Sequence, residues 1–76
     1  MKEKVESNLT GRQYYPDDVV RIVNYRQAAA YIAHEAQLID IYPSTDFKTN
    51  TPILVFIFNR ADTHELYDLW CKHELN

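Results

Sequence analysis

Apolar residues gather in five segments after residue 15, and three of these segments have the pattern of strands. Residues 19–23 (VVRIV), 38–42 (LIDIY) and 53–58 (ILVFIF) are rich in β-branched and aromatic side chains, which favours extended structure. The first two segments alternate, so we expect Val20 and Ile22 on one face of the sheet and Arg21 on the other. The same rule separates two sets in the second strand: Leu38, Asp40 and Tyr42 on one face, Ile39 and Ile41 on the other. The third segment is apolar on both faces, which is typical of a central strand.

The other two segments have the pattern of helices. Residues 25–36 (YRQAAAYIAHEA) contain three consecutive alanines and follow Asn24, which with Gln27 fits a capping box. The predicted buried stripe of this helix comprises Tyr25, Ala28, Ala29, Ile32 and Ala36. A second helix starts at Asn59 or Asp62 and runs almost to Asn76. Its predicted core stripe is Leu66, Leu69, Trp70 and His73.

This order of elements, β-α-β-β-α, predicts an α+β fold. A helix between the first two strands makes them parallel, and the loop at 43–51 makes the third strand antiparallel to the second. We therefore expect a mixed three-stranded sheet in the order 1-3-2, with the third strand central and both helices on one face. That arrangement is a ferredoxin-like fold that lacks its last strand.

Two helices cover only one face of such a sheet, which leaves an apolar face for a partner. The candidate partner-binding residues are Leu54, Phe56, Phe58, Ile39, Ile41 and Arg21. Alternate residues of the third strand point to opposite faces. If the helices cover the other face, the exposed residues are instead Ile53, Val55 and Ile57. The free edges of the two outer strands are further sites at which another chain adds a strand.

Residues 1–15 are polar and have no apolar period, so we expect a flexible N-terminal arm followed by a single domain over 16–76. The arm is the alternative cover for the open sheet face, with Tyr14 and Tyr15 as its apolar contacts.

Composition narrows the class of protein. The net charge of −3, with both signs scattered along the chain, argues against binding of nucleic acid by bulk charge. A lone cysteine, Cys71, excludes a disulfide framework and favours a reducing compartment. The longest apolar run has six residues, far fewer than the roughly 20 needed to span a membrane. We expect a cytoplasmic protein.

No motif predicts catalysis, a metal or a cofactor. Three His-Glu pairs occur, at 34–35, 64–65 and 73–74, but none has the second histidine four residues later that a zinc protease needs. Cys71 and His73 are two apart on a helix and so point in different directions. We predict no enzymatic activity and no small-molecule substrate.

Four segments together carry a resemblance to a known group of proteins: VVRIVNYRQAAAYIAHEAQ, LIDIY, ILVFIFNR and ELYDLW. Over about residues 19–75 the chain is similar to a small uncharacterised family of Gram-positive bacteria, their phages and other mobile elements. The shared positions are core positions, so the resemblance implies a fold and no catalytic residue. Members of the family often have Gly where this chain has Glu35.

The sequence thus predicts a small non-enzymatic protein-interaction module that binds a protein partner or a second copy as a homodimer. The family resemblance implies an inhibitor or modulator of a host protein. The alternative is a nucleic-acid-binding module, in which Phe56 and Phe58 stack bases and scattered Arg and Lys residues contact phosphates.

Overall fold

A computed structural model describes residues 3–75; Met1 and Lys2 of the predicted arm and Asn76 of the predicted domain lie outside the described residues. The fold class is α+β, as predicted. The elements in chain order are β1 (Val5–Glu6), β2 (Gln13–Tyr14), the 3-10 turn η1 (Pro16–Asp18), β3 (Val19–Ile22), α1 (Tyr25–Ala33), β4 (Leu38–Asp46), β5 (Thr51–Asn59) and α2 (Arg60–Cys71).

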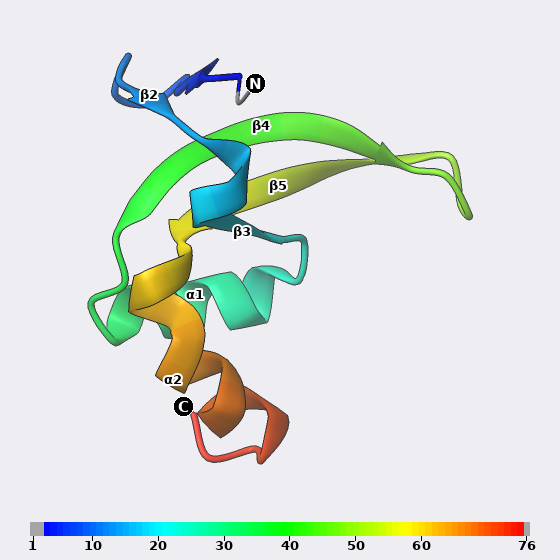
Figure 1. The fold of residues 1–76 in the computed structure, drawn as a ribbon. Helices are drawn as coiled ribbons and strands as arrows, with labels where there is room; N and C mark the ends of the chain where they lie inside the picture. Colours follow the sequence, from blue (N-terminus) through cyan, green and yellow to red (C-terminus); the bar gives the residue numbers. More distant parts are fainter. Residues whose placement is uncertain (1–2, 76) are drawn as a thin grey trace.

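The main sheet has the strand order β3-β5-β4, with the apolar strand β5 in the centre. Both neighbouring pairs are antiparallel, so the predicted mixed sheet is wrong. The physical reason lies in the order itself: because β5 separates β3 from β4, the two strands joined through α1 are never neighbours. Both helices lie on one side of this sheet and the β1–β2 hairpin lies on the other (Figure 1).

A β-bulge changes which face the residues of β4 occupy. Leu38 is opposite Phe58 and Asp40 is opposite Ile57, which leaves Ile39 as the extra residue between them. Ile39 therefore packs in the same cluster as Ile57, on the hairpin side, whereas Leu38 packs against the helix-side core. The expected face sharing of Ile39 with Ile41, and of Leu38 with Asp40, is wrong for this reason.

Strands β4 and β5 are both longer than their apolar runs. Each has nine residues, and their pairing continues past Pro43 to Asp46 and Thr51. Pro43 is tolerated because β4 is an edge strand. The predicted loop at 43–51 thus shrinks to a tip at 47–50.

The first helix begins as predicted and buries Ala28 of the predicted stripe, and Ala36 is buried just after its end. The side chain of Asn24 accepts hydrogen bonds from the backbone amides of Arg26 and Gln27, at 3.0 and 3.3 Å. The side chain of Gln27 donates to the hydroxyl of Tyr31 at 2.8 Å, so it does not close the capping box.

The buried residues of α1 are Ala28, Ala30 and Tyr31, whereas Tyr25 and Ile32 of the predicted stripe are exposed. Tyr31 takes the central place because its ring packs edge-on against Phe58, with centroids 5.4 Å apart. Helix spacing alone did not distinguish these two stripes.

Both helices end in the same type of C-terminal motif. At the end of α1, the amide of Ala36 donates to the carbonyl of Tyr31, and Glu35 adopts a φ of 70°. At the end of α2, the amide of Glu74 donates to the carbonyl of Leu69, and His73 adopts a φ of 58°. These are Schellman motifs, in which glycine is the usual residue at the left-handed position. They end the helices earlier than predicted, at Ala33 and Cys71.

Helix α2 is capped by Asn59, whose side chain accepts from the amide of Ala61 at 2.9 Å, rather than by Asp62. Its Leu66, Leu69 and Trp70 pack on the helix-side core, as the stripe predicts. Leu75 is buried in the same core. No helix among the described residues is long and apolar enough to cross a membrane.

Candidate functional site

The structure distributes the six predicted partner-binding residues over both sides of the sheet. Phe58 is fully buried beneath α1, and Phe56 packs against the same core. Leu54 is half exposed, Ile41 is half-buried, and Ile39 packs on the opposite side. Arg21 is exposed, with its guanidinium carbon 6.0 Å from the ring centre of Tyr42. These residues do not form one surface, because the helices cover the face to which the phenylalanines belong.

The other face of the sheet is covered by the N-terminal hairpin. Val19, Val55 and Ile57 are buried there, and Tyr14, Ile39 and Tyr42 pack around them. The hairpin turns at Gly11, whose φ of 72° suits glycine. The sequence predicts a flexible arm over residues 1–15. In the structure, Val5–Glu6 and Gln13–Tyr14 pair as two short strands, and hydrogen bonds between residues 26 and 32 apart in sequence join this hairpin to β4.

Asp40 is the residue that holds the hairpin in place. Its carboxylate is buried and accepts hydrogen bonds from the amide of Asn8 at 2.7 Å, the amide of Ile41 at 2.9 Å and the hydroxyl of Tyr14 at 2.8 Å. Burial, and then the hydrogen bond to Asp40, raise the pKa of Tyr14 to about 12. The Ser7 hydroxyl donates to the carbonyl of Ile39 beside this carboxylate. We call Asp40 with these hairpin donors the latch.

The outer edge of β4 is therefore poorly suited to strand addition. The Asn8 side chain also reaches the carbonyl of Ile41, at 3.4 Å, and Pro43 lacks an amide hydrogen. At the other edge, Arg60 donates to the carbonyls of Asp17 and Val19, at 3.2 and 3.0 Å. Both edges predicted to be open are thus partly occupied by side chains of the same chain.

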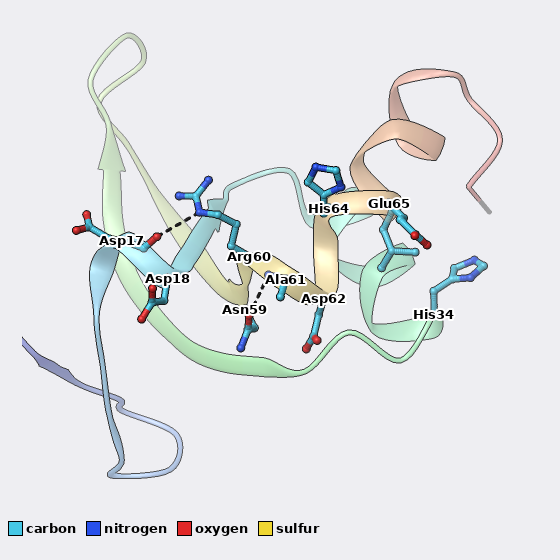
Figure 2. A pocket seen from close by; sticks show the side chains of 10 residues that line it. Asp17, Asp18, His34, Asn59, Arg60, Ala61, Asp62, His64 and Glu65 are labelled. Carbon is cyan, nitrogen blue, oxygen red and sulfur yellow. Dashed lines mark hydrogen bonds between the residues drawn. The ribbon is translucent and has the colours of Figure 1, made fainter.

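A groove at the start of α2 gathers charged side chains (Figure 2). It is lined by Asp17, Asp18, His34, Asn59, Arg60, Ala61, Asp62, His64, Glu65 and Leu66. In Figure 2 the carboxylates of Asp18, Asp62 and Glu65 point in different directions instead of toward one point. The amide of Gln37 donates to Asp62 at 3.4 Å, and Arg60 is tied to the backbone as described above. The three carboxylates thus do not converge on one point of the groove.

We next consider the side chains that could bind a metal ion, and the single cysteine. Residues 3–75 contain no group of three or more His, Cys, Asp or Glu side chains placed to hold a metal ion. Cys71 is exposed, and hydrogen bonding to it raises the pKa of Tyr67, one turn earlier on α2.

The most prominent exposed feature is the end of the long β-hairpin. Strand β3 pairs with β5 only up to the Ile22–Phe56 pair, so residues 42–55 continue as a two-stranded ribbon, which we call the β-arm. In Figure 1 it extends away from the body, past the turn that joins β3 to α1. Phe47 at its tip is 92% exposed, the highest value among the large apolar residues that the structure exposes.

Sequence reasoning missed Phe47 because it lies among turn-forming residues, in PSTDFKTNT. The signal was a single aromatic residue in an otherwise polar loop between two apolar strands. When the flanking strands stay paired up to the turn, an aromatic residue in the turn projects beyond the sheet and cannot reach the core.

Comparisons with protein-family models, with curated proteins and with solved structures found no match to this chain.

Proposed function

We propose that this protein is a small non-enzymatic interaction module that binds a partner protein through the β-arm. The observation that carries the proposal is Phe47, an aromatic side chain 92% exposed at the end of a projecting ribbon. Aromatic residues are enriched at protein interfaces, where one ring in a pocket supplies much of the binding free energy.

The tip is organised by its own hydrogen bonds, which favours binding without a large ordering cost. The carboxylate of Asp46 accepts from the amide of Lys48 at 3.0 Å, and the hydroxyl of Thr51 donates to the carbonyl of Thr49 at 3.3 Å. Asn50 adopts a φ of 55°, in the left-handed region that asparagine tolerates. Because the backbone around Phe47 is set before contact, less conformational entropy is lost on binding.

The chemistry of the tip indicates the kind of surface it fits. Asp46 and Lys48 flank Phe47, so the tip carries both charges and no net charge. An apolar pocket with an acidic and a basic residue on its rim complements this arrangement. The partner proposed is therefore a folded protein with such a pocket.

Several further features support the same function. The resemblance to proteins of phages and mobile elements supports a host protein as the target, with inhibition or modulation as the result. The lone Cys71 supports a cytoplasmic location. The strand order and the placement of both helices on one face support a truncated ferredoxin-like fold for residues 16–76. The divergent side chains of the α2 groove support a role without catalysis.

The nucleic-acid alternative relies on Phe56 and Phe58 as stacking rings. Phe58 has no exposed surface and Phe56 packs against the helix-side core, so these rings are not available to bases. The β-arm tip has no net positive charge with which to contact phosphates.

A capture experiment with matched variants tests the proposal. Wild type, Phe47→Ser and Leu9→Ser are immobilised and exposed to lysate of a Gram-positive host. Leu9 is the control because it is also an exposed large apolar residue, 51% accessible, but lies in the β1–β2 turn. We expect wild type and Leu9→Ser to retain the same protein and Phe47→Ser to lose it.

Thermal melts of the three chains show whether each is folded before capture. Retention of one protein by all three variants, or of none by wild type, contradicts the proposal that the β-arm binds a host protein.

A further inference from the structure

A cavity beside the β3 edge has the properties that the β-arm tip requires of a partner. It has a volume of about 380 Å³ and lies between β3 and α2. Its lining comprises Val20, Arg21, Ile22, Tyr31, Arg60, Thr63, His64, Tyr67 and Asp68. Tyr67, 55% exposed, supplies an aromatic wall. We call it the β3–α2 cavity.

The size of the β3–α2 cavity suits one aromatic side chain. A protein cavity of roughly 150 Å³ already holds benzene, so this larger and more open cavity has room for the ring of Phe47. Two tyrosines, Tyr31 and Tyr67, line it, and aromatic rings favour edge-to-face contacts with one another.

The charges at the β3–α2 cavity complement those of the tip. Arg60 and Asp68, both on α2, lie two helical turns apart and so place a positive and a negative group at the cavity. On the tip, Asp46 and Lys48 stand on either side of Phe47. With the ring in the cavity, we expect Lys48 to pair with Asp68 and Asp46 to lie toward Arg60, whose guanidinium also donates to the carbonyls of Asp17 and Val19.

We propose, on the basis of the proposed function, that the β-arm also binds a second copy of this chain, whose β3–α2 cavity receives Phe47. Beyond the packed Tyr42–Val55 pair, the four remaining residues of each arm strand reach roughly 13 Å, enough to contact a neighbouring molecule. In Figure 1 the arm curves toward the side of the sheet that carries the helices, and residues of both helices line the cavity. A two-fold axis lets each chain insert its own tip and receive the other, which closes the assembly as a dimer.

The contact is small, so the dimer is weak. Two tips in two cavities bury an area at the low end for protein interfaces, and we expect a dissociation constant on the order of 10–100 µM. Sedimentation velocity over a concentration series that spans this range is the measurement. A reductant is present throughout, because the exposed Cys71 is able to link two chains covalently.

The first comparison uses wild type, Phe47→Ser and the control Leu9→Ser. We expect wild type and Leu9→Ser to dimerise alike, and Phe47→Ser to raise the dissociation constant by roughly 30-fold or more. A monomeric wild type over the whole series overturns the inference, as does a dimer that Phe47→Ser leaves unchanged. In either case the proposed function stands if capture from lysate still depends on Phe47, and fails with the inference if it does not.

The second comparison tests the cavity itself by exchanging charges. Lys48→Asp and Asp68→Lys each place like charges together, and each is expected to weaken the dimer by about 3–10-fold. Both sites are exposed, so folding is preserved, which thermal melts check. The double variant Lys48→Asp/Asp68→Lys restores the pair and is expected to return to near the wild-type value. If it is as weak as the two single changes combined, Phe47 does not enter the β3–α2 cavity and the assignment is overturned.

Discussion

The two faces of the sheet are covered in different ways. On the helix side, α1 and α2 bury a continuous apolar core centred on the edge-to-face pair of Tyr31 and Phe58. On the hairpin side, two short strands of two residues each cover Val55 and Ile57. The latch at Asp40 holds this hairpin in place with hydrogen bonds. The helix side is stabilised by many apolar contacts, whereas the hairpin side depends on hydrogen bonds to the single carboxylate of Asp40. The hairpin side is therefore expected to open locally while the helix side unfolds only with the whole domain.

The largest effect is expected from Phe58→Ala. Removal of a fully buried ring costs about 3–5 kcal/mol of the free energy of unfolding, through lost burial and the cavity left behind. For a domain of this size that is a large part of its stability, so thermal denaturation shows a strongly lowered Tm. Phe58→Leu, which keeps most of the volume, is the control. If Phe58→Ala melts within a few degrees of wild type, the helix side is not the main core.

Asp40→Ala is expected to act on the hairpin side alone. It leaves the Tyr14 hydroxyl and the Asn8 amide without their acceptor, at a cost of about 2–3 kcal/mol. Amide hydrogen exchange over residues 5–14 accelerates by a corresponding factor, while exchange in α1 changes much less. Asp46→Ala, which removes a carboxylate from the β-arm tip, is the control. Equal acceleration in both regions contradicts the idea of a separable hairpin side.

High pH offers a second way to release the latch. The pKa of Tyr14 is about 12 in the folded protein and 10.0 as the ordinary value, so the folded state holds this proton more tightly. The associated stabilisation is complete below pH 10 and is lost as the pH rises from about 10 to 12. Ultraviolet titration should show one phenol with the late midpoint, absent from Tyr14→Phe. Hydrogen exchange of the hairpin should rise over the same pH window in wild type, and show no such step in Tyr14→Phe.

The smallest effect is expected from Glu35→Gly. The residue has a φ of 70°, which is unfavourable for side chains other than glycine, so the change should stabilise the protein by about 0.5–1 kcal/mol. The gain belongs to the end of α1 and should raise Tm without slowing exchange in the hairpin. His73→Gly, at the equivalent position after α2, serves as an independent repeat. A loss of stability in both variants would show that these side chains make contacts that outweigh the backbone strain.

Local sequence signals determined much of what the fold contains. The apolar runs specify the three strands of the main sheet, and Asn24 specifies the start of α1, because these preferences depend on neighbouring residues. The doubly apolar run at 53–58 is consistent with the central position of β5, since only a central strand buries both faces. Asn59 was one of two candidate caps for α2, and local sequence did not choose between them.

Tertiary structure decided the features from which a function is inferred. The bulge at Ile39 places that residue on the hairpin side, and Asp40 meets Asn8 and Tyr14 through contacts 32 and 26 residues apart in sequence. The polar composition of residues 3–15 gives no local sign of this, because their stabilisation comes from a buried partner elsewhere in the chain. Phe47 is exposed because β4 and β5 continue to pair beyond the end of β3. The sequence alone determined the elements, whereas long-range pairing decided which surfaces they leave open.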